Sequence, residues 1–240
     1  MIEKILPDAV ASAEAFEDPP RAVLYPGEAE LISRAVDKRR REFRTVRHCA
    51  RQALGQLGLP PVAVLRGQHG EPLWPPGVVG SMTHCTGYRA AAVARSCEIY
   101  ALGIDAEPNA PLPAGVLDMI ALVNERQQLS QLAATDRTTC WDRLLFSAKE
   151  AVYKAWFPLA YRWLGFEDAA VTITLDTTDP AQGTFVAHLL VPGVTGTGHP
   201  LTQLDGHWLR SGELVLTAIT LLPPVLRRPG REVATIPARD

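Results

Sequence analysis

The sequence predicts an α+β fold made of two similar halves. Two long helical blocks, at residues 28–57 and 139–158, are each accompanied by short segments with the apolar character of strands. With 240 residues and 47% hydrophobic content, the chain is long enough for one large domain or two small ones. We expect an N-terminal half at residues 1–104, a C-terminal half at 105–222 and a flexible tail at 223–240. No internal repeat is visible in the sequence.

The first half begins irregularly and then turns helical. Residues 1–27 hold four prolines and leave room for one short strand at 22–25. From residue 28 onwards the pattern is helical, with a buried apolar stripe formed by Phe43, Val46, Ala50, Leu54 and Leu57. Gly58 and the two prolines that follow it end this helix. A proline- and glycine-rich loop at 72–80 then leads to short strands at 90–94 and 99–104.

The second half shows a helix followed by strands. Thr139 and Asp142 resemble a capping box at the helix start, and Pro158 ends the helix. Ser211 and Gly212 form the turn of a hairpin at the end of the sheet. The strand-like segments are residues 170–175, 184–191, 207–210 and 213–221. The proline- and arginine-rich residues from 223 to 240 are predicted to be disordered.

Composition and charge argue against several classes of protein. The formal net charge is −2 and the pI is about 6.3, so no overall positive field favours nucleic acid or an anionic membrane. No apolar run approaches the ~20 residues of a membrane span, and the N-terminus lacks the order of a signal peptide. The four cysteines form no CxxC pair, which favours free thiols in a reducing compartment. We expect a soluble cytoplasmic protein that binds neither nucleic acid nor membranes.

Two acids close an apolar strand near the middle of the chain. Asp105 and Glu107 lie two positions apart in the segment GIDAEP, and residues i and i+2 of a strand point the same way. Both carboxylates then face one spot, where Mg²⁺ can be held together with waters and substrate phosphates. The alternative is a pair of solvated acids in a turn before Pro108.

The helix around residues 146–156 carries the most specific pattern. Glu150 and Lys154 are four residues apart, so their charged ends are neighbours, and the aromatic side chains near them indicate a partly buried face. Lysine is unusual in this sequence, because only four of the 24 lysine and arginine residues are lysines: Lys4, Lys38, Lys149 and Lys154. A compact ammonium beside a carboxylate suits proton transfer and phosphate chemistry. The alternative is an ordinary surface ion pair.

The segment GSMTHC, at residues 80–85, places hydroxyl groups and a histidine after the proline-rich loop. It does not match GxSxG, so we do not expect a nucleophile elbow. Thr83 and His84 suit contacts to phosphate or hydroxyl groups. The alternative is a structural histidine, which is the commoner role of a lone histidine in such a position.

A basic stretch at residues 38–51 contains seven basic side chains and one acid, Glu42. On a helix, Arg40, Arg44, Arg47 and Arg51 form one stripe beside the apolar one. A small polyphosphate ligand needs only two or three of these arginines. Nucleic acid is a weaker hypothesis, because interleaved aromatics and a basic net charge are missing. A solvated helix face is the remaining alternative.

Together these segments resemble the larger, Sfp-like 4′-phosphopantetheinyl transferases, in particular the branch that modifies siderophore, polyketide and lipid-synthase carrier proteins. The resemblance is carried by the segments WPPGVVGSMTHCTGYRAA, GIDAEP and FSAKEAVYKAWFPL. RTVRHCARQAL and RWLGFEDA support it, and the match runs from about Lys38 to Leu222. It implies two similar α/β halves in a pseudo-two-fold arrangement, with coenzyme A in the cleft between them.

The resemblance also implies roles for individual residues. Asp105 and Glu107 bind Mg²⁺, or Mn²⁺ as the alternative ion, with the backbone of Ala106 nearby. Glu150 either completes the metal shell or acts as base towards the carrier serine, and Lys154 lies at the transferred phosphate. The implied catalytic residues are Asp105, Glu150 and Lys154, which also contact coenzyme A. The other implied contacts to coenzyme A come from Arg39, Arg47, Arg66, Gly67, Gln68, His69, Thr83 and His84. Arg66 departs from the family pattern, since many relatives carry lysine there, but the charge is kept.

The implied reaction moves the 4′-phosphopantetheine arm of coenzyme A onto a serine of an acyl or peptidyl carrier protein and releases 3′,5′-ADP. No covalent enzyme intermediate is required, which agrees with a sequence without an obvious activated nucleophile. We expect a monomer whose partners are coenzyme A and carrier protein domains. The alternatives are a metal-dependent phosphohydrolase that uses the same acids on a nucleotide-like pyrophosphate, and a non-catalytic binding module built around the basic helix.

Overall fold

A computed structural model describes residues 1–194, 198 and 200–223 of the chain. In chain order the elements are η1 (Ile2–Ile5), β1 (Val10–Ala15), α1 (Glu28–Leu31), α2 (Asp37–Gln56), β2 (Leu65–Arg66), β3 (Pro72–Leu73), β4 (Val78–Cys85), β5 (Tyr88–Arg95), β6 (Ala101–Pro108), α3 (Val116–Ile120), α4 (Val123–Thr135), α5 (Trp141–Ala160), η2 (Phe166–Asp168), β7 (Ala169–Leu175), β8 (Gln182–Val194), β9 (Pro200–Ser211) and β10 (Leu214–Leu221).

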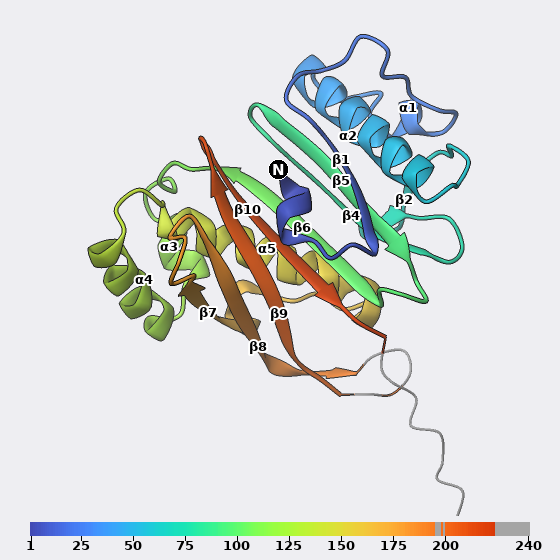
Figure 1. Ribbon diagram of the computed structural model, residues 1–240. Coiled ribbons are helices and arrows are strands. Elements are labelled where there is room, and N and C mark those ends of the chain that lie inside the picture. The colour runs from blue at the N-terminus through green and yellow to red at the C-terminus, as the bar shows by residue number, and fades with distance from the viewer. Residues whose placement is uncertain (195–197, 199, 224–240) are drawn as a thin grey trace, which may run out of the picture.

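The first half places a long helix on a small sheet. Strands β1, β5 and β4 form an antiparallel sheet in that order, and α2 covers one face of it (Figure 1). Strand β5 is rich in alanine, so the helix can lie close to it: Ala91 packs with Cys49 and Ala50, and Val93 packs with Leu54. This packing fixes the direction of the basic face of α2.

The second half repeats the plan with a larger sheet. Strands β6, β10, β9, β8 and β7 form an antiparallel sheet in that order, and α5 lies against it. The helix lies close to β6 at Gly103, where an added β carbon would lie 2.1 Å from the carbonyl oxygen of Ala151. Glycine is therefore needed at this position for the two elements to touch.

The two sheets share a core. One face of β5 packs on α2, and its other face, with Tyr88 and Ala92, packs with Ile104 of β6 and Leu216 of β10. The layers therefore run from α2 through the first sheet and the second sheet to α5 (Figure 1). The predicted α+β class with two halves, each combining one 20-residue helix with a sheet, is confirmed.

The start of the chain differs from the sequence prediction. The strand lies at Val10–Ala15, and residues 22–25 form none. The helical block from residue 28 is split into α1 and α2, which ends at Gln56. The end of the loop predicted at 72–80 contains the start of β4, so Thr83 and His84 lie on a strand.

The second half also holds differences. Residues 116–120 and 123–135, for which no helix was predicted, form α3 and α4. Helix α5 begins after Cys140 without a side-chain cap, so the predicted capping box is wrong: Asp142 instead accepts a hydrogen bond from the backbone N–H of Leu112. Pro158 lies inside the last turn of α5, which continues to Ala160.

The boundaries between parts of the chain stay predictions. Strand β6 runs through the expected boundary after residue 104, and the predicted tail lies outside the described residues from 224 onwards. All four cysteines are free thiols, as predicted. Among the described helices, none combines the length and the apolar character that crossing a membrane requires.

Candidate functional site

The two acids of β6 face helix α5, as the strand periodicity predicts. Asp105 is 4% exposed, and its Oδ1 accepts a hydrogen bond from Lys154 Nζ at 2.7 Å. The same ammonium donates to the carbonyl oxygen of Ile104 at 3.1 Å. Ile104 and Ala106 point the other way, into the core shared by the sheets. The strand therefore separates the core from a charged face that meets α5.

Glu107 is held by a residue that sequence reasoning missed. Arg143 Nη1 lies 3.0 Å from Glu107 Oε2, and its other nitrogens donate to the carbonyl oxygens of Ala110 and Pro111. Burial, followed by the charge of Asp105, raises the pKa of Glu107 to about 7, and Arg143 opposes this rise. A signal was present in the sequence, because Arg143 lies seven residues before Glu150 and hence on the same helical face.

One carboxylate oxygen at this site, Oδ2 of Asp105, has no hydrogen-bond partner among the described residues. Asp105 Oδ1 has two donors, Lys154 Nζ and Thr83 Oγ1, the latter at 3.1 Å. In the described part of the chain, no hydrogen-bond partner reaches the buried Oδ2. A buried, unsatisfied carboxylate oxygen is costly unless something binds to it. Its natural partner is a cation.

Glu150 lies one helical turn before Lys154 and is half-buried. Burial raises the pKa of its carboxyl, the Lys154 ammonium lowers it, and the Asp105 carboxylate raises it. These influences put Glu150 within electrostatic range of both groups. Over the described residues, however, no set of three or more aspartate, glutamate, histidine or cysteine side chains is arranged to hold a metal ion. The acids would have to converge for a cation to bind to all of them.

A second group consists of arginines. The Arg47 guanidinium lies 3.3 Å from the ring centroid of Phe43, and that of Arg66 lies 5.5 Å from the same ring. Arg47 is 5% exposed, and burial, followed by the charge of Arg66, lowers its pKa to about 9. Burial and the charge of Arg39 likewise lower the pKa of Arg66. The three predicted arginines are therefore close enough to repel one another.

This arginine group is poorly compensated. The carboxylate of Glu42 lies 3.9 Å from Arg39, and within the described residues the buried Nε of Arg47 has no hydrogen-bond partner. By contrast, Arg51 of the same helix forms a buried ion pair with Glu28 at 2.9 Å. Clustered cations with a free donor are suited to a multivalent anion.

His84 connects the two groups. Its Nε2 lies 3.7 Å from Glu42, at the arginine end. Burial and the charge of Arg39 lower its pKa, while Lys154 and Asp105, at the other end, also act on it. Glu42 lies near both Arg39 and His84, and Thr83, the neighbour of His84 on β4, donates to Asp105, so a strip of charged and polar groups runs from the arginines past His84 to Asp105.

The predicted loop residues lie above helix α5. Gly67, Gln68 and His69 connect β2 to β3, and the loop is closed by a hydrogen bond from the Gly67 N–H to the Glu71 carbonyl oxygen at 2.8 Å. The His69 ring lies 5.3 Å from the ring of Phe157 on α5. A loop of the first half thus reaches helix α5 of the second half.

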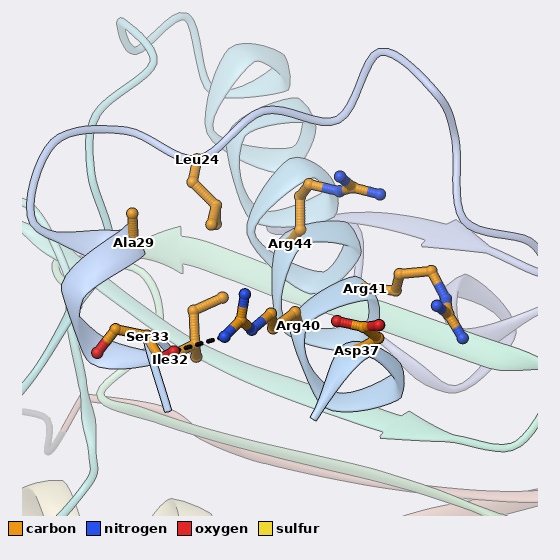
Figure 2. Close-up of a pocket in the computed structure, with 8 residues that line it drawn as sticks. All are labelled: Leu24, Ala29, Ile32, Ser33, Asp37, Arg40, Arg41 and Arg44. Atoms are coloured by element: carbon orange, nitrogen blue, oxygen red, sulfur yellow. Dashed lines mark hydrogen bonds between the residues drawn. The ribbon is translucent and has the colours of Figure 1, made fainter. Parts of the chain in front are cut away.

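Two cavities border these elements. One, of about 190 Å³, begins beside Glu150 and is lined by Lys149, Glu150, Val152, Tyr153, Trp163, Leu164, Gly165, Phe166 and Ala169. The larger one, of about 350 Å³, lies between residues 24–37 and α2 (Figure 2). Arg40 and Arg44 of the basic stripe line it, but none of the residues that the resemblance implies for coenzyme A or the metal does. Arg40 donates there to the carbonyl oxygens of Ser33 and Ala35, and Figure 2 shows Arg41 and Arg44 pointing away from it. The smaller cavity is the one that joins the charged strip.

Comparisons with known proteins match both halves. The 4′-phosphopantetheinyl transferase N-terminal domain matches residues 27–94, and the 4′-phosphopantetheinyl transferase superfamily matches residues 101–192. The chain is 54% identical to the 4′-phosphopantetheinyl transferase Npt of Nocardia iowensis over 222 residues, which cover 91% of this chain and 99% of the relative.

Two further relatives also match over most of the chain. The chain is 52% identical to the 4′-phosphopantetheinyl transferase PptT of Mycobacterium tuberculosis, over 92% of this chain and 98% of the relative. It is 30% identical to enterobactin synthase component D of Salmonella typhi, over 87% of this chain and 84% of that protein.

Proposed function

The chain belongs to the 4′-phosphopantetheinyl transferase superfamily, whose members transfer the phosphopantetheine arm of coenzyme A to carrier proteins, and from this premise we propose how its own residues do so. The observation that carries the proposal is the strip in which His84 joins three mutually repelling arginines to the buried Asp105 and the partly buried Glu107. Coenzyme A combines a nucleotide with three phosphates and a polar chain, so its charges are complementary to those of the arginines and of a bound cation.

The arginine end binds the nucleotide. Arg39, Arg47 and Arg66 offset the negative charges of the phosphates. The ligand in turn relieves the repulsion that, after burial, lowers the pKa values of Arg47 and Arg66. His84 contacts the 3′-phosphoadenosine portion. The loop of Gly67, Gln68 and His69 covers the nucleotide from the side of β2.

The acidic end holds a divalent cation. Asp105 and Glu107 supply carboxylate oxygens, and Glu150 adds a third where it is a metal ligand and not the base. Hard oxygen ligands suit Mg²⁺ and, as the alternative, Mn²⁺. The free Oδ2 of Asp105 supports this fit. The N–H of Ala106 faces β4, and on an extended strand the carbonyl oxygen of the same residue leaves towards the same edge, so it can add a fourth oxygen. When bound, the ion neutralises charge on the pyrophosphate.

The proton transfer falls to Glu150. The serine oxygen of the carrier attacks the β-phosphorus, the bond from phosphorus to the oxygen of the departing 3′,5′-ADP breaks, and Glu150 accepts the proton of the serine. Burial raises the pKa of this carboxyl, which suits a base that must hold a proton near neutral pH. If Glu150 instead completes the metal shell, another acceptor is needed, and the two roles remain alternatives.

Lys154 acts on the transferred phosphate. Its ammonium is held by Asp105 and the carbonyl oxygen of Ile104, so it is fixed in place before the ligand arrives. A positioned cation stabilises charge that develops on the phosphoryl group. The cavity beside Glu150, with Tyr153 and Trp163 in its wall, gives the pantetheine arm an apolar place next to the reacting phosphorus.

The partners follow from this chemistry. The substrate serine belongs to an acyl or peptidyl carrier protein, and similarity to an enterobactin synthase component supports carriers of siderophore assembly among them. We expect the enzyme to work as a monomer, because both ends of the strip come from one chain. The free cysteines support a reducing compartment such as the cytoplasm.

Intact-mass spectrometry tests the proposal. An apo carrier protein incubated with the enzyme, coenzyme A and Mg²⁺ should gain one phosphopantetheine, and the gain should disappear when EDTA replaces Mg²⁺. The Asp105→Asn variant should show no gain under the same conditions. Release of pantetheine phosphate into water without labelled carrier would instead identify a phosphohydrolase, and equal labelling in EDTA would refute the metal site.

A further inference from the structure

Two hydroxyl groups join the two sheets of the molecule. Ser81 Oγ accepts a hydrogen bond from the N–H of Ile104 at 3.0 Å, and Thr83 Oγ1 accepts one from the N–H of Ala106 at 3.0 Å. Strand β4 is an edge of the first sheet and β6 is an edge of the second, and the two strands are not paired in one sheet. Where β4 meets β6, these two side-chain hydroxyls therefore satisfy backbone N–H groups that a neighbouring strand would satisfy within a sheet.

The two positions differ in what the hydroxyl proton does. Thr83 donates it to Asp105 Oδ1 at 3.1 Å. Ser81 makes the same bridge to the strand without touching a carboxylate. Ser81 and Thr83 are both buried, 3% and 4% exposed. The two residues can therefore be compared directly, because both bind a backbone N–H of β6 but only Thr83 also contacts Asp105.

The Asp105 carboxylate is thereby fixed by one oxygen. Thr83 and Lys154 both donate to Oδ1, so the carboxylate cannot exchange its oxygens without breaking two hydrogen bonds. A β-branched side chain such as Thr83 also has little rotamer freedom. Oδ2 is then held in its partnerless orientation.

We propose that Thr83 is a positioning residue that orients the Asp105 carboxylate so that Oδ2 is presented to the divalent cation. This inference rests on the proposed function, since it assumes that the cation binds at Asp105. It assigns Thr83 a role different from the contact to coenzyme A that the sequence suggested. A hydroxyl has a single proton, and a phosphate oxygen can only accept, so Thr83 cannot serve Asp105 and a phosphate together.

The test compares Thr83→Val, Thr83→Ser and Ser81→Ala. The first and the last each leave one backbone N–H of β6 without its partner, so they cause matched damage at the sheet junction. Mn²⁺ is the probe, and electron paramagnetic resonance measures its dissociation constant in the presence of saturating coenzyme A without a carrier. Titration calorimetry in EDTA measures coenzyme A binding by the metal-free protein.

Thr83→Val should raise the Mn²⁺ dissociation constant about tenfold, the usual effect of removing a group that orients a metal ligand. Thr83→Ser should restore it to within about twofold of the parent, and Ser81→Ala should leave it unchanged. Coenzyme A affinity in EDTA should be the same in all four proteins. If Thr83→Val does not fold, Thr83→Cys, whose thiol is a weak donor, takes its place with the same expectation.

Three outcomes overturn the inference. Equal weakening of Mn²⁺ binding by Thr83→Val and Ser81→Ala would mean that both hydroxyls only join the strands. Unchanged Mn²⁺ binding in Thr83→Val would remove its link to the cation. Weaker coenzyme A binding by Thr83→Val in EDTA would favour a contact to the nucleotide. Asp105→Asn is the reference: if it binds Mn²⁺ as the parent does, the metal site of the proposed function fails as well.

Discussion

The two lysines of helix α5 have different surroundings. Lys149 is 3% exposed and lies 2.9 Å from the carboxylate of Glu125, and it also donates to the carbonyl oxygens of Phe166 and Ala169. Lys154 keeps a quarter of its side chain exposed and reaches Asp105. The first ammonium has all of its partners inside the protein and serves stability, whereas the second is accessible to a ligand.

This difference predicts that replacing Lys154 by methionine impairs catalysis, whereas replacing Lys149 by methionine impairs stability. Lys154→Met should lower the turnover number by about 10²-fold, the scale of losing a group that stabilises developing charge, with the dissociation constant of coenzyme A changed less. Lys149→Met should lower the free energy of unfolding by about 3–5 kcal/mol, because it leaves Glu125 buried without its cation. Turnover assays, calorimetry and urea denaturation separate the two effects. A Lys154→Met enzyme with the parent turnover number would remove Lys154 from the mechanism.

The pKa of His84 should be lowered by the protein around it and raised again when coenzyme A binds. Burial and Arg39 lower its pKa below the ordinary 6.5, so the unfolded state binds the proton more tightly. The contribution of the neutral His84 to the free energy of unfolding should therefore be complete above pH 6.5 and be lost as the pH falls below that value. Phosphate groups of coenzyme A should raise the pKa.

Proton NMR of the His84 ring, identified by its loss in His84→Gln, measures the midpoint with and without coenzyme A. Thermal melts at pH 5 and pH 7.5 should show a smaller difference for the variant than for the parent. A midpoint above 6.5 in the free protein, or one that coenzyme A leaves unmoved, would contradict the placement of His84 between the arginines and the acids.

At the scale of the elements, the contact of α5 with β6 depends on Gly103. An added β carbon would lie 2.1 Å from the Ala151 carbonyl oxygen and 2.9 Å from the backbone nitrogen of Ala155, next to Lys154. Gly103→Ala should force the helix away, lower the free energy of unfolding by about 1–3 kcal/mol and break the contact of Lys154 with Asp105, so that turnover falls too.

Gly55→Ala is the matched control in helix α2. Nothing lies within 4 Å of an added β carbon there, so the substitution should raise the free energy of unfolding by about 0.5–1 kcal/mol through helix propensity alone. Urea denaturation measures both variants. Equal and small effects would show that α5 does not rest on β6 as closely as the structure places it.

The elements that the sequence predicted are those with strong apolar periodicity. Helices α2 and α5 bury a stripe of side chains, β7 alternates buried and more exposed positions, and β10 buries six apolar or small residues in a row. Strand β1 was missed because its six residues are mostly small and gain their order from pairing with the alanines of β5. Helix α4 buries only Glu125, Leu129 and Leu132, too few apolar positions for a clear period.

The site was predictable where one element carries both partners. The i, i+2 spacing of Asp105 and Glu107 and the i, i+4 spacing of Glu150 and Lys154 needed no knowledge of the fold. Arg143 was missed, and the hydrogen bonds of the Ser81 and Thr83 hydroxyls with β6 were not foreseen, because these partners come from another element. Sequence spacing cannot show which donors a second sheet brings against a strand.

At the scale of the whole molecule, the proposed site is assembled by both halves. The arginines come from the first half, the acids and Lys154 from the second, and His84 lies where β4 meets β6. The core between the sheets draws side chains from both, including Tyr88 and Leu216. The relative position of the two ends of the strip therefore depends on the same packing that stabilises the protein.

This organisation predicts that removing the metal stops transfer without unfolding the protein. The carboxylates of Asp105 and Glu107 already have Lys154 and Arg143 as partners, so their charges are balanced before any ion binds. EDTA should abolish carrier labelling but shift the melting temperature by less than about 2 °C, which for a chain of this length is under ~1 kcal/mol. Excess Mg²⁺ should then restore full labelling. A large drop in melting temperature, or activity that Mg²⁺ fails to restore, would instead mean that the ion holds the two halves together, as structural metals do.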